Sequence, residues 1–236
     1  MPDQPRLPLR PTIDHSIEAL IVSQSNREAW DRLERWPTWP GGAMVLIGPA
    51  GSGKSHMGDV WAQRANAFRL SPEATADRAL AAFSDNGGRL LLDDVDRALD
   101  DDAIFLLLDL VKVQGGAVLL TSRSEPAMWP FRSPDLASRC LALPRSTLTE
   151  PDDALLQGVL RRLCRARFIE MPDDVARFLS RHMERSFSAA RRVADALDED
   201  LVRGARPVSK AAARKALEKA GLGRAALEDE EAGEIT

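Results

Sequence analysis

The sequence predicts an α/β protein in which a parallel sheet, covered by helices on both faces (αβα), is followed by a small α-helical domain. Three short apolar runs, at 43–47, 89–92 and 117–121, alternate with helical stretches. Continuous apolar strands of this kind are typical of a parallel sheet that is buried on both faces. Beyond Pro144 the chain shows amphipathic helical patterns with no strand between them, which predicts the separate helical domain.

The order of elements along the chain predicts four regions. Residues 1–12 hold four of the fifteen prolines and predict an extended tail, because proline continues neither a helix nor a central strand. The sheet domain is predicted over 13–147, beginning with a helix over 17–36 that the WPTWPGG stretch ends. The helical domain is predicted over 148–220, with helices at 151–168, 172–184, 187–202 and 209–220. An acidic tail, 221–236, follows.

Composition limits the possible functions. With 32 Lys and Arg against 36 Asp and Glu, the formal net charge is −4, so the chain lacks the basic excess of a protein that binds nucleic acid by bulk electrostatics. We expect any DNA contact to be indirect or weak; the nine arginines within 161–192 form either a solvated face or a local contact surface. No run has the length of a signal peptide or membrane helix, which predicts a soluble, cytoplasmic protein without membrane contact.

Two isolated cysteines, Cys140 and Cys164, are the only ones in the chain. Neither has a CxxC partner or a neighbouring cluster of His and Cys, so the sequence suggests no disulfide framework and no zinc site. We predict that both are buried, reduced thiols.

A phosphate-binding loop follows the first predicted strand. Residues 48–55, GPAGSGKS, fit G-x-x-x-x-G-K-[ST] and lie between a strand and a helix, as a P-loop requires. In such a loop backbone N–H groups face the phosphate oxygens, the lysine reaches the outer phosphates and the next hydroxyl ligates Mg²⁺. The predicted nucleotide contacts in and after the loop are Gly48, Gly51, Ser52, Gly53, Lys54, Ser55 and His56.

Further polar residues follow the second and third predicted strands, at the sheet edge where ligands bind. Asp93 is predicted to hold Mg²⁺ together with Ser55, and Asp94 to orient or deprotonate the attacking water; an acidic turn is the alternative for Asp94. Residues 121–123 either sense a γ-phosphate or cap a loop. Arg139 is either a surface ion-pair residue or a finger that acts on a nucleotide held by a neighbouring subunit.

Together these segments resemble the AAA+ ATPases of the DnaA branch, and within it the Hda family, which promotes hydrolysis of the ATP bound to the replication initiator DnaA. The resemblance covers about residues 4–217 and rests on VSQSNREAW, GPAGSGKSH, LLLDDVD, VLLTSRSEP, PDLASR and MPDDVARFLSRHMERSF. It implies that Arg139, in the DLASR box, is a trans-acting arginine finger. It also implies that Ile21, Val22 and Asn26 line the adenine site of a protein that binds ATP or ADP with Mg²⁺.

Three features favour the Hda family over DnaA itself. About thirty residues follow Pro207, too few for the helix-turn-helix domain of DnaA, and about twenty separate Leu70 from Arg89, too few for its DNA-contacting insertion. QPRLPL, at 4–9, resembles the peptide with which Hda docks on the DNA sliding clamp, although so short a peptide also occurs by chance. The clamp contacts that this resemblance implies are Gln4, Leu7, Pro8 and Leu9.

The chain departs from the DnaA pattern at two places. Arg123 replaces an acidic residue, and Ser188 stands where the lid of DnaA-type proteins has a nucleotide-sensing arginine. Arg185, Arg191 and Arg192 are the candidate substitutes. We therefore expect nucleotide binding to be intact and the chain's own ATP turnover to be weak.

The resemblance implies a negative regulator of replication initiation, possible as a homodimer, whose partners are DnaA and the sliding clamp. The rival hypothesis is an autonomous AAA+ ATPase of the helicase-loader type that remodels a DNA-bound partner. A P-loop kinase for a small metabolite is a third hypothesis, disfavoured by the helical domain and the DLASR box.

Overall fold

A parallel sheet of five strands, in the order β2-β3-β4-β1-β5, is the centre of the larger lobe in the computed structural model, which describes residues 20–97, 100–200 and 207–222. Every neighbouring pair of strands runs parallel. The strands are β1 (Ala43–Ile47), β2 (Phe68–Leu70), β3 (Arg89–Leu92), β4 (Ala117–Ser122) and β5 (Arg145–Thr147).

The register of the central strands brings three loops to one edge of the sheet. Ile47, the last residue of β1, lies opposite Ser122 at the end of β4, and Leu92 at the end of β3 lies opposite Leu120. Because parallel strands end at the same edge, the P-loop after β1 and the polar residues after β3 and β4 are neighbours. This edge is where the sequence predicts the nucleotide site.

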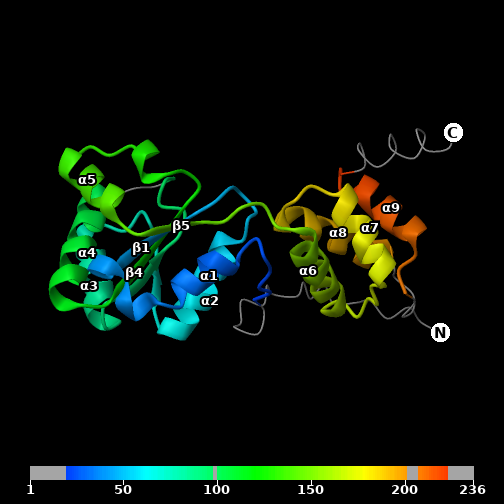
Figure 1. The fold of residues 1–236 in the computed structure, drawn as a ribbon, viewed down its shortest axis with the longest axis horizontal. Coiled ribbons are helices and arrows are strands. Elements are labelled where there is room, and N and C mark those ends of the chain that lie inside the picture. Colours follow the sequence, from blue (N-terminus) through cyan, green and yellow to red (C-terminus); the bar gives the residue numbers. More distant parts are fainter. Residues whose placement is uncertain (1–19, 98–99, 201–206, 223–236) are drawn as a thin grey trace, which may run out of the picture.

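Helices cover both faces of the sheet, as predicted (Figure 1). Alternate strand residues face opposite ways: Val45 and Ile47 share a core with α3, α4 and α5, whereas Met44 and Leu46 share one with α1 and α2. These helices are α1 (Arg27–Leu33), α2 (Lys54–Ala65), α3 (Ala76–Asp85), α4 (Asp101–Gln114) and α5 (Pro134–Ala142), and short 3-10 turns lie at η2 (Trp36–Thr38), η3 (Pro40–Gly42) and η4 (Pro126–Met128).

A second, all-helical lobe follows the sheet, and we call it the helical lobe. It contains α6 (Asp153–Arg165), α7 (Asp173–His182), α8 (Phe187–Asp200) and α9 (Lys210–Lys219). Its buried residues form a core of their own, from Leu156 to Leu217. Figure 1 shows this lobe at the opposite end of the molecule from α3, α4 and α5.

Both cysteines are buried and unpaired, as predicted. Burial raises the pKa of the Cys140 thiol, in α5, and of the Cys164 thiol, in α6, to about 12. Both therefore remain protonated at neutral pH and behave as small apolar side chains. Within the described ranges no helix combines the length and the apolar character needed to cross a bilayer.

The structure corrects the predicted helix over 17–36. Residues 20–26 are not helical, and α1 begins only at Arg27. The side chain of Asn26 accepts a hydrogen bond from the backbone N–H of Ser23 and donates one to the carbonyl of Ile21. These local bonds hold a turn, which apolar spacing alone does not reveal.

Two strands and two helices were missing from the sequence prediction. The edge strands β2 and β5 are three residues long and carry exposed or polar side chains, so neither forms an apolar run. Helices α3 and α5 lie in segments for which no helix was predicted. The predicted tail of residues 1–12, with its four clamp contacts, lies outside the described residues, as do residues 223–236 of the predicted acidic tail.

Candidate nucleotide-binding site

The P-loop joins β1 to α2, as predicted, and its backbone conformation depends on glycine. Gly51 and Gly53 have φ values of 75° and 95°, a left-handed conformation that costs little only for glycine. Ser52 is 4% exposed, and its hydroxyl has no hydrogen-bond partner among the residues that the structure describes. Because a buried hydroxyl without a partner is unfavourable, an anionic ligand in the loop would satisfy it.

Lys54 lies at the base of the loop and is 5% exposed. Its Nζ donates to the carbonyl of Gly48 at 2.6 Å and to that of Pro49 at 2.9 Å. Burial lowers the pKa of Lys54 below its ordinary value of 10.5, and the nearby carboxylate of Asp94 offsets part of the shift. The ammonium group is thus held on the loop, ready to exchange a carbonyl for a phosphate oxygen. Ser55 and His56 follow in the first turn of α2, both half-buried.

Asp93 follows β3 and uses both of its carboxylate oxygens inside the protein. The hydroxyl of Thr121 donates to Oδ1 at 2.5 Å, and Nη2 of Arg69 lies 2.6 Å from Oδ2. The side chain of Asp93 is 11% exposed, whereas that of Arg69 is 47% exposed. The carboxylate is therefore shielded from water and neutralised by an arginine from the edge strand β2.

Asp94 is held by the residues that follow β4. Its backbone, at φ 56°, donates to the hydroxyl of Thr121 at 2.9 Å. Its Oδ2 lies 3.3 Å from Nη2 of Arg123 and 3.8 Å from Nη1 of Arg97. The carboxylate of Asp94, which was predicted to activate water, is thus paired with the guanidinium groups of Arg123 and Arg97.

The polar residues at the end of β4 serve the loop around them. Thr121 is fully buried between Asp93 and the backbone of Asp94. The hydroxyl of Ser122 donates to the carbonyl of Ser124 at 2.7 Å and accepts from the indole of Trp129 at 2.9 Å. These bonds support the loop-capping alternative for both hydroxyls.

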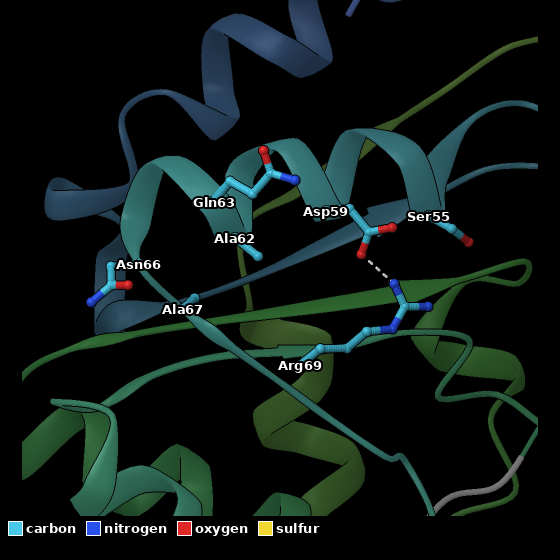
Figure 2. A pocket seen from close by; sticks show the side chains of 7 residues that line it. All are labelled: Ser55, Asp59, Ala62, Gln63, Asn66, Ala67 and Arg69. Atoms are coloured by element: carbon cyan, nitrogen blue, oxygen red, sulfur yellow. Dashed lines mark hydrogen bonds and ion pairs between the residues drawn. The ribbon is translucent and has the colours of Figure 1, made fainter. Parts of the chain in front are cut away.

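Of the two predicted Mg²⁺ ligands, Ser55 lines an open groove, and Asp93 is paired with Arg69, another residue of that groove. Ser55, Asp59 and Arg69 line the groove between α2 and β2, and Figure 2 shows Asp59 and Arg69 joined across it with Ser55 at the start of the same helix. Each oxygen of Asp93 already has a partner. As arranged, these residues do not fit a divalent cation.

The segment predicted to line the adenine site lies between the two lobes and contacts both. Asn26 is buried, and its amide is used within the turn described above rather than directed outward. Val22 packs against the core that contains α1 and α2, and Ile21 lies against Gly158 of α6. Ser25 donates its backbone N–H to Asp152 at 3.0 Å. The three residues therefore lie at the joint between the lobes.

The helical lobe touches the P-loop through the start of α8. The N–H of Phe187 donates to the carbonyl of Gly51 at 3.0 Å, and the ring of Phe187 lies so close to Gly53 that a Cβ there would overlap it. Ser188 is exposed, and its hydroxyl is 3.0 Å from that of Ser186.

The three candidate sensor arginines differ in how they are held. Arg185 bonds to Pro151 and Asp153, and Arg192 pairs with Glu184. Arg191 is exposed and is not seen in an ion pair with any described residue.

Comparison with known proteins identifies the fold. No family model matches the chain, and no curated protein matches its sequence. Among solved structures, domain III of the replication initiation protein DnaA from Thermotoga maritima superposes with a TM-score of 0.70, at 18% identity, over 90% of this chain and 98% of that one. The chain has the AAA+ fold.

Two other solved structures agree with this assignment of the AAA+ fold. The RuvB Holliday junction branch migration motor of Thermotoga maritima gives a TM-score of 0.65 at 17% identity, over 84% of this chain and 72% of that one. A DNA replication initiation factor gives a TM-score of 0.58 at 15% identity, over 95% of this chain and 94% of that one. The parallel sheet with its P-loop is what these proteins share with this chain.

In this AAA+ fold, Arg139 lies in the last turn of α5. Its guanidinium forms ion pairs with Asp109 of α4 and with Asp135 one turn earlier in α5, and it stacks 4.1 Å above the ring of Phe105. The hydrogen bond to Asp109 raises the pKa of Arg139 further above its ordinary value. The charge is permanent, and the side chain is 36% exposed.

Several site residues were not found from the sequence. Arg69 lies in β2, a strand that the sequence did not reveal, and Phe187 and Asp152 act through contacts with residues more than a hundred positions away. Asp152, at the start of the predicted helix 151–168 and directly before α6, was a usable signal for an N-cap. No local pattern connects Arg69 to Asp93.

Proposed function

We propose that this chain is a regulator of DNA replication initiation that binds an adenine nucleotide and acts as Hda proteins do, by stimulating hydrolysis of the ATP bound to DnaA. One observation carries the proposal. Arg139 belongs to α5, which lies at the opposite end of the molecule from the helical lobe (Figure 1). Because the helical lobe contacts the chain's own P-loop, this separation supports a role for Arg139 on a nucleotide bound to another molecule.

The surroundings of Arg139 suit a group that acts on a partner's phosphates. Asp109 and Asp135 hold the guanidinium in place, and Phe105 supports one of its faces. When the partner docks, the guanidinium exchanges a carboxylate for phosphate oxygens, and its charge stabilises the negative charge of the transition state. An arginine prepared in this way loses little side-chain entropy on docking.

The nucleotide of the chain itself acts as a structural switch in this proposal. ATP or ADP in the P-loop would set the angle of the helical lobe, because Phe187 rests on Gly51 and Ser25 is bonded to Asp152. That angle determines the surface offered to DnaA. The chain's own turnover is weak because the carboxylate of Asp94 is paired with Arg123 and Arg97.

The proposal also includes binding of the N-terminal peptide to the sliding clamp. The peptide at 4–9 would dock on the clamp through Gln4, Leu7, Pro8 and Leu9, since a segment stiffened by proline loses little entropy on binding. Tethering raises the effective concentration of the chain near replicated DNA, a gain on the order of 10² to 10⁴. Contact with DNA is then indirect, and a homodimer is compatible with the same surfaces.

The test is a DnaA–ATP hydrolysis assay with clamp and DNA. Arg139→Ala should abolish the stimulation while nucleotide and clamp binding persist. Arg32→Ala is the matched control, because Arg32 also pairs with an acidic residue one turn away on a helix of the sheet lobe. Full stimulation by Arg139→Ala would remove the mechanism.

Two further measurements test the other parts of the proposal. Deletion of residues 1–12 should remove capture by the clamp and leave nucleotide binding unchanged. Strong ATP hydrolysis by the pure chain, stimulated by single-stranded DNA, would favour the helicase-loader function instead.

A further inference from the structure

An arginine pairs with Asp93, the carboxylate that the sequence predicts to hold Mg²⁺ together with Ser55. Arg69 extends from the edge strand β2 and pairs with Asp93 after β3 and with Asp59 on α2. It also lines the groove that begins at Ser55, the other residue expected to ligate Mg²⁺ (Figure 2). One guanidinium group thus lies among the residues from which a Mg²⁺ site would be built.

We propose that Arg69 takes the place of the divalent cation at Asp93, so that this chain binds adenine nucleotides without requiring Mg²⁺. The inference rests on the nucleotide binding proposed above. Arg69 balances negative charge at this sheet edge and thereby determines the metal dependence of binding.

The positions of the groups around Asp93 favour Arg69 over a metal ion. One oxygen of Asp93 accepts a hydrogen bond from Thr121 at 2.5 Å, and the other lies 2.6 Å from Nη2 of Arg69. Thr121 is fully buried and also accepts the N–H of Asp94, so its position is fixed. A metal ion at Asp93 would have to displace Arg69 from a short, charge-assisted contact.

The balance of charges around Asp93 also favours Arg69 over a metal ion. Mg²⁺ sites in P-loop proteins combine acidic side chains with phosphates, and the metal neutralises both. Here Arg69 pairs with both Asp59 and Asp93, and Asp94 pairs with Arg123 and Arg97. Three guanidinium groups thus balance these three carboxylates, and Lys54 remains for the phosphates. These carboxylates leave no unpaired negative charge that a divalent cation would have to neutralise.

The burial of Asp93 explains why Arg69 matters more than an ordinary surface ion pair. Exposed pairs contribute little, but the side chain of Asp93 is 11% exposed, and a buried carboxylate needs a partner. Removing Arg69 leaves that carboxylate uncompensated, and Mg²⁺ is the natural replacement. The alternative is that Arg69 only stabilises the packing of β2 against α2. Its removal would then change the stability of the chain and leave the Mg²⁺ dependence of nucleotide binding unchanged.

The experiment measures the affinity of the full chain for ADP and for ATP by calorimetry, in saturating MgCl₂ and in EDTA. For the unchanged chain we expect the two dissociation constants to agree within about twofold. For Arg69→Ala we expect Mg²⁺ to tighten binding by about tenfold, equivalent to roughly 1.4 kcal/mol. Arg64→Ala is the matched control, because Arg64 pairs with Glu34 at similar exposure, and it should behave as the unchanged chain.

A direct probe avoids dependence on the folding of Arg69→Ala. Electron paramagnetic resonance of Mn²⁺ with the unchanged chain and ADP should show the ion bound to nucleotide and water, without a protein carboxylate ligand. A carboxylate-bound Mn²⁺, or a Mg²⁺ dependence as large as that of Arg69→Ala, would overturn the inference and leave nucleotide binding standing. Absence of nucleotide binding under every condition would overturn both.

Discussion

The backbone N–H of Phe187 donates a hydrogen bond to the carbonyl of Gly51 at 3.0 Å. The first residue of α8 therefore rests on the P-loop, and the two lobes meet at the phosphate cradle. A change in the conformation of the P-loop should therefore alter the contact between the loop and the helical lobe. This coupling has consequences that mutagenesis can measure.

Gly53→Ala should destabilise the chain and abolish nucleotide binding. The new Cβ would meet the ring of Phe187, and φ at this position is 95°, which costs an L-residue about 1–2 kcal/mol. Denaturant unfolding with nucleotide titration is the measurement. The double variant Gly53→Ala/Phe187→Ala removes the overlap and keeps the backbone strain, so it should recover only part of the stability. Full recovery would contradict the role given to the backbone conformation.

Nucleotide binding should weaken as the pH rises. The loss should begin at a lower pH than it would for a lysine of ordinary pKa. Burial lowers the pKa of Lys54 below 10.5, and only the ammonium form attracts phosphate. The stability of the fold changes in the opposite direction. Because burial in the folded chain disfavours the charged form of Lys54, the free energy of unfolding increases as the pH rises through the lowered pKa. Calorimetric titrations across alkaline pH check the prediction, with Lys54→Arg as the variant that stays charged. Identical pH profiles for the two chains would contradict it.

Asp152→Ala should cost about 1–2 kcal/mol of stability. Asp152 caps α6 by accepting the N–H of Leu155 at 2.8 Å, and it also binds Ser25 across the lobes. Burial opposes ionisation, but the hydrogen bonds from Leu155, Ser23 and Ser25 together lower the pKa of Asp152 below 3.8. The stabilisation that ionised Asp152 contributes is therefore fully present above pH 3.8, its ordinary pKa, and is lost as the pH falls through the lowered pKa.

The control for Asp152 is Asp152→Asn. Asparagine is also a good N-cap, so this variant should retain most of the stability at neutral pH while losing the acid-dependent part. Chemical denaturation at neutral and acidic pH separates the two contributions. Equal losses in the alanine and asparagine variants would show that the cap is not the cause.

Arg123→Ala should raise the chain's own ATP hydrolysis by about tenfold, a barrier change of about 1.4 kcal/mol. Arg123 pairs with the carboxylate of Asp94 at 3.3 Å, and its removal frees that carboxylate to orient water. Steady-state hydrolysis measures the effect. Arg97→Ala is the graded control, because Arg97 is 65% exposed and lies 3.8 Å from the same carboxylate. An unchanged rate in both variants would show that Asp94 does not act on water.

Local sequence patterns predicted the central part of the fold well. The strands β1, β3 and β4 are apolar runs, and the P-loop is a contiguous motif, so each was readable within a few residues. The helices of the helical lobe were found within a few residues of their bounds because each has one apolar face. Edge strands such as β2 and β5 lack this signal, since only one side of each is paired and their side chains are partly exposed.

The sequence by itself therefore determined which residues form the phosphate loop, which strands are central and that a helical lobe follows. Only the tertiary structure decided that Arg69 neutralises Asp93, that Arg123 pairs with Asp94 and that Phe187 rests on Gly51. The physical reason is the range of the interactions. Periodicity and motifs record bonds between residues close in sequence, whereas these three contacts join residues that the parallel sheet and the second lobe bring together from distant positions.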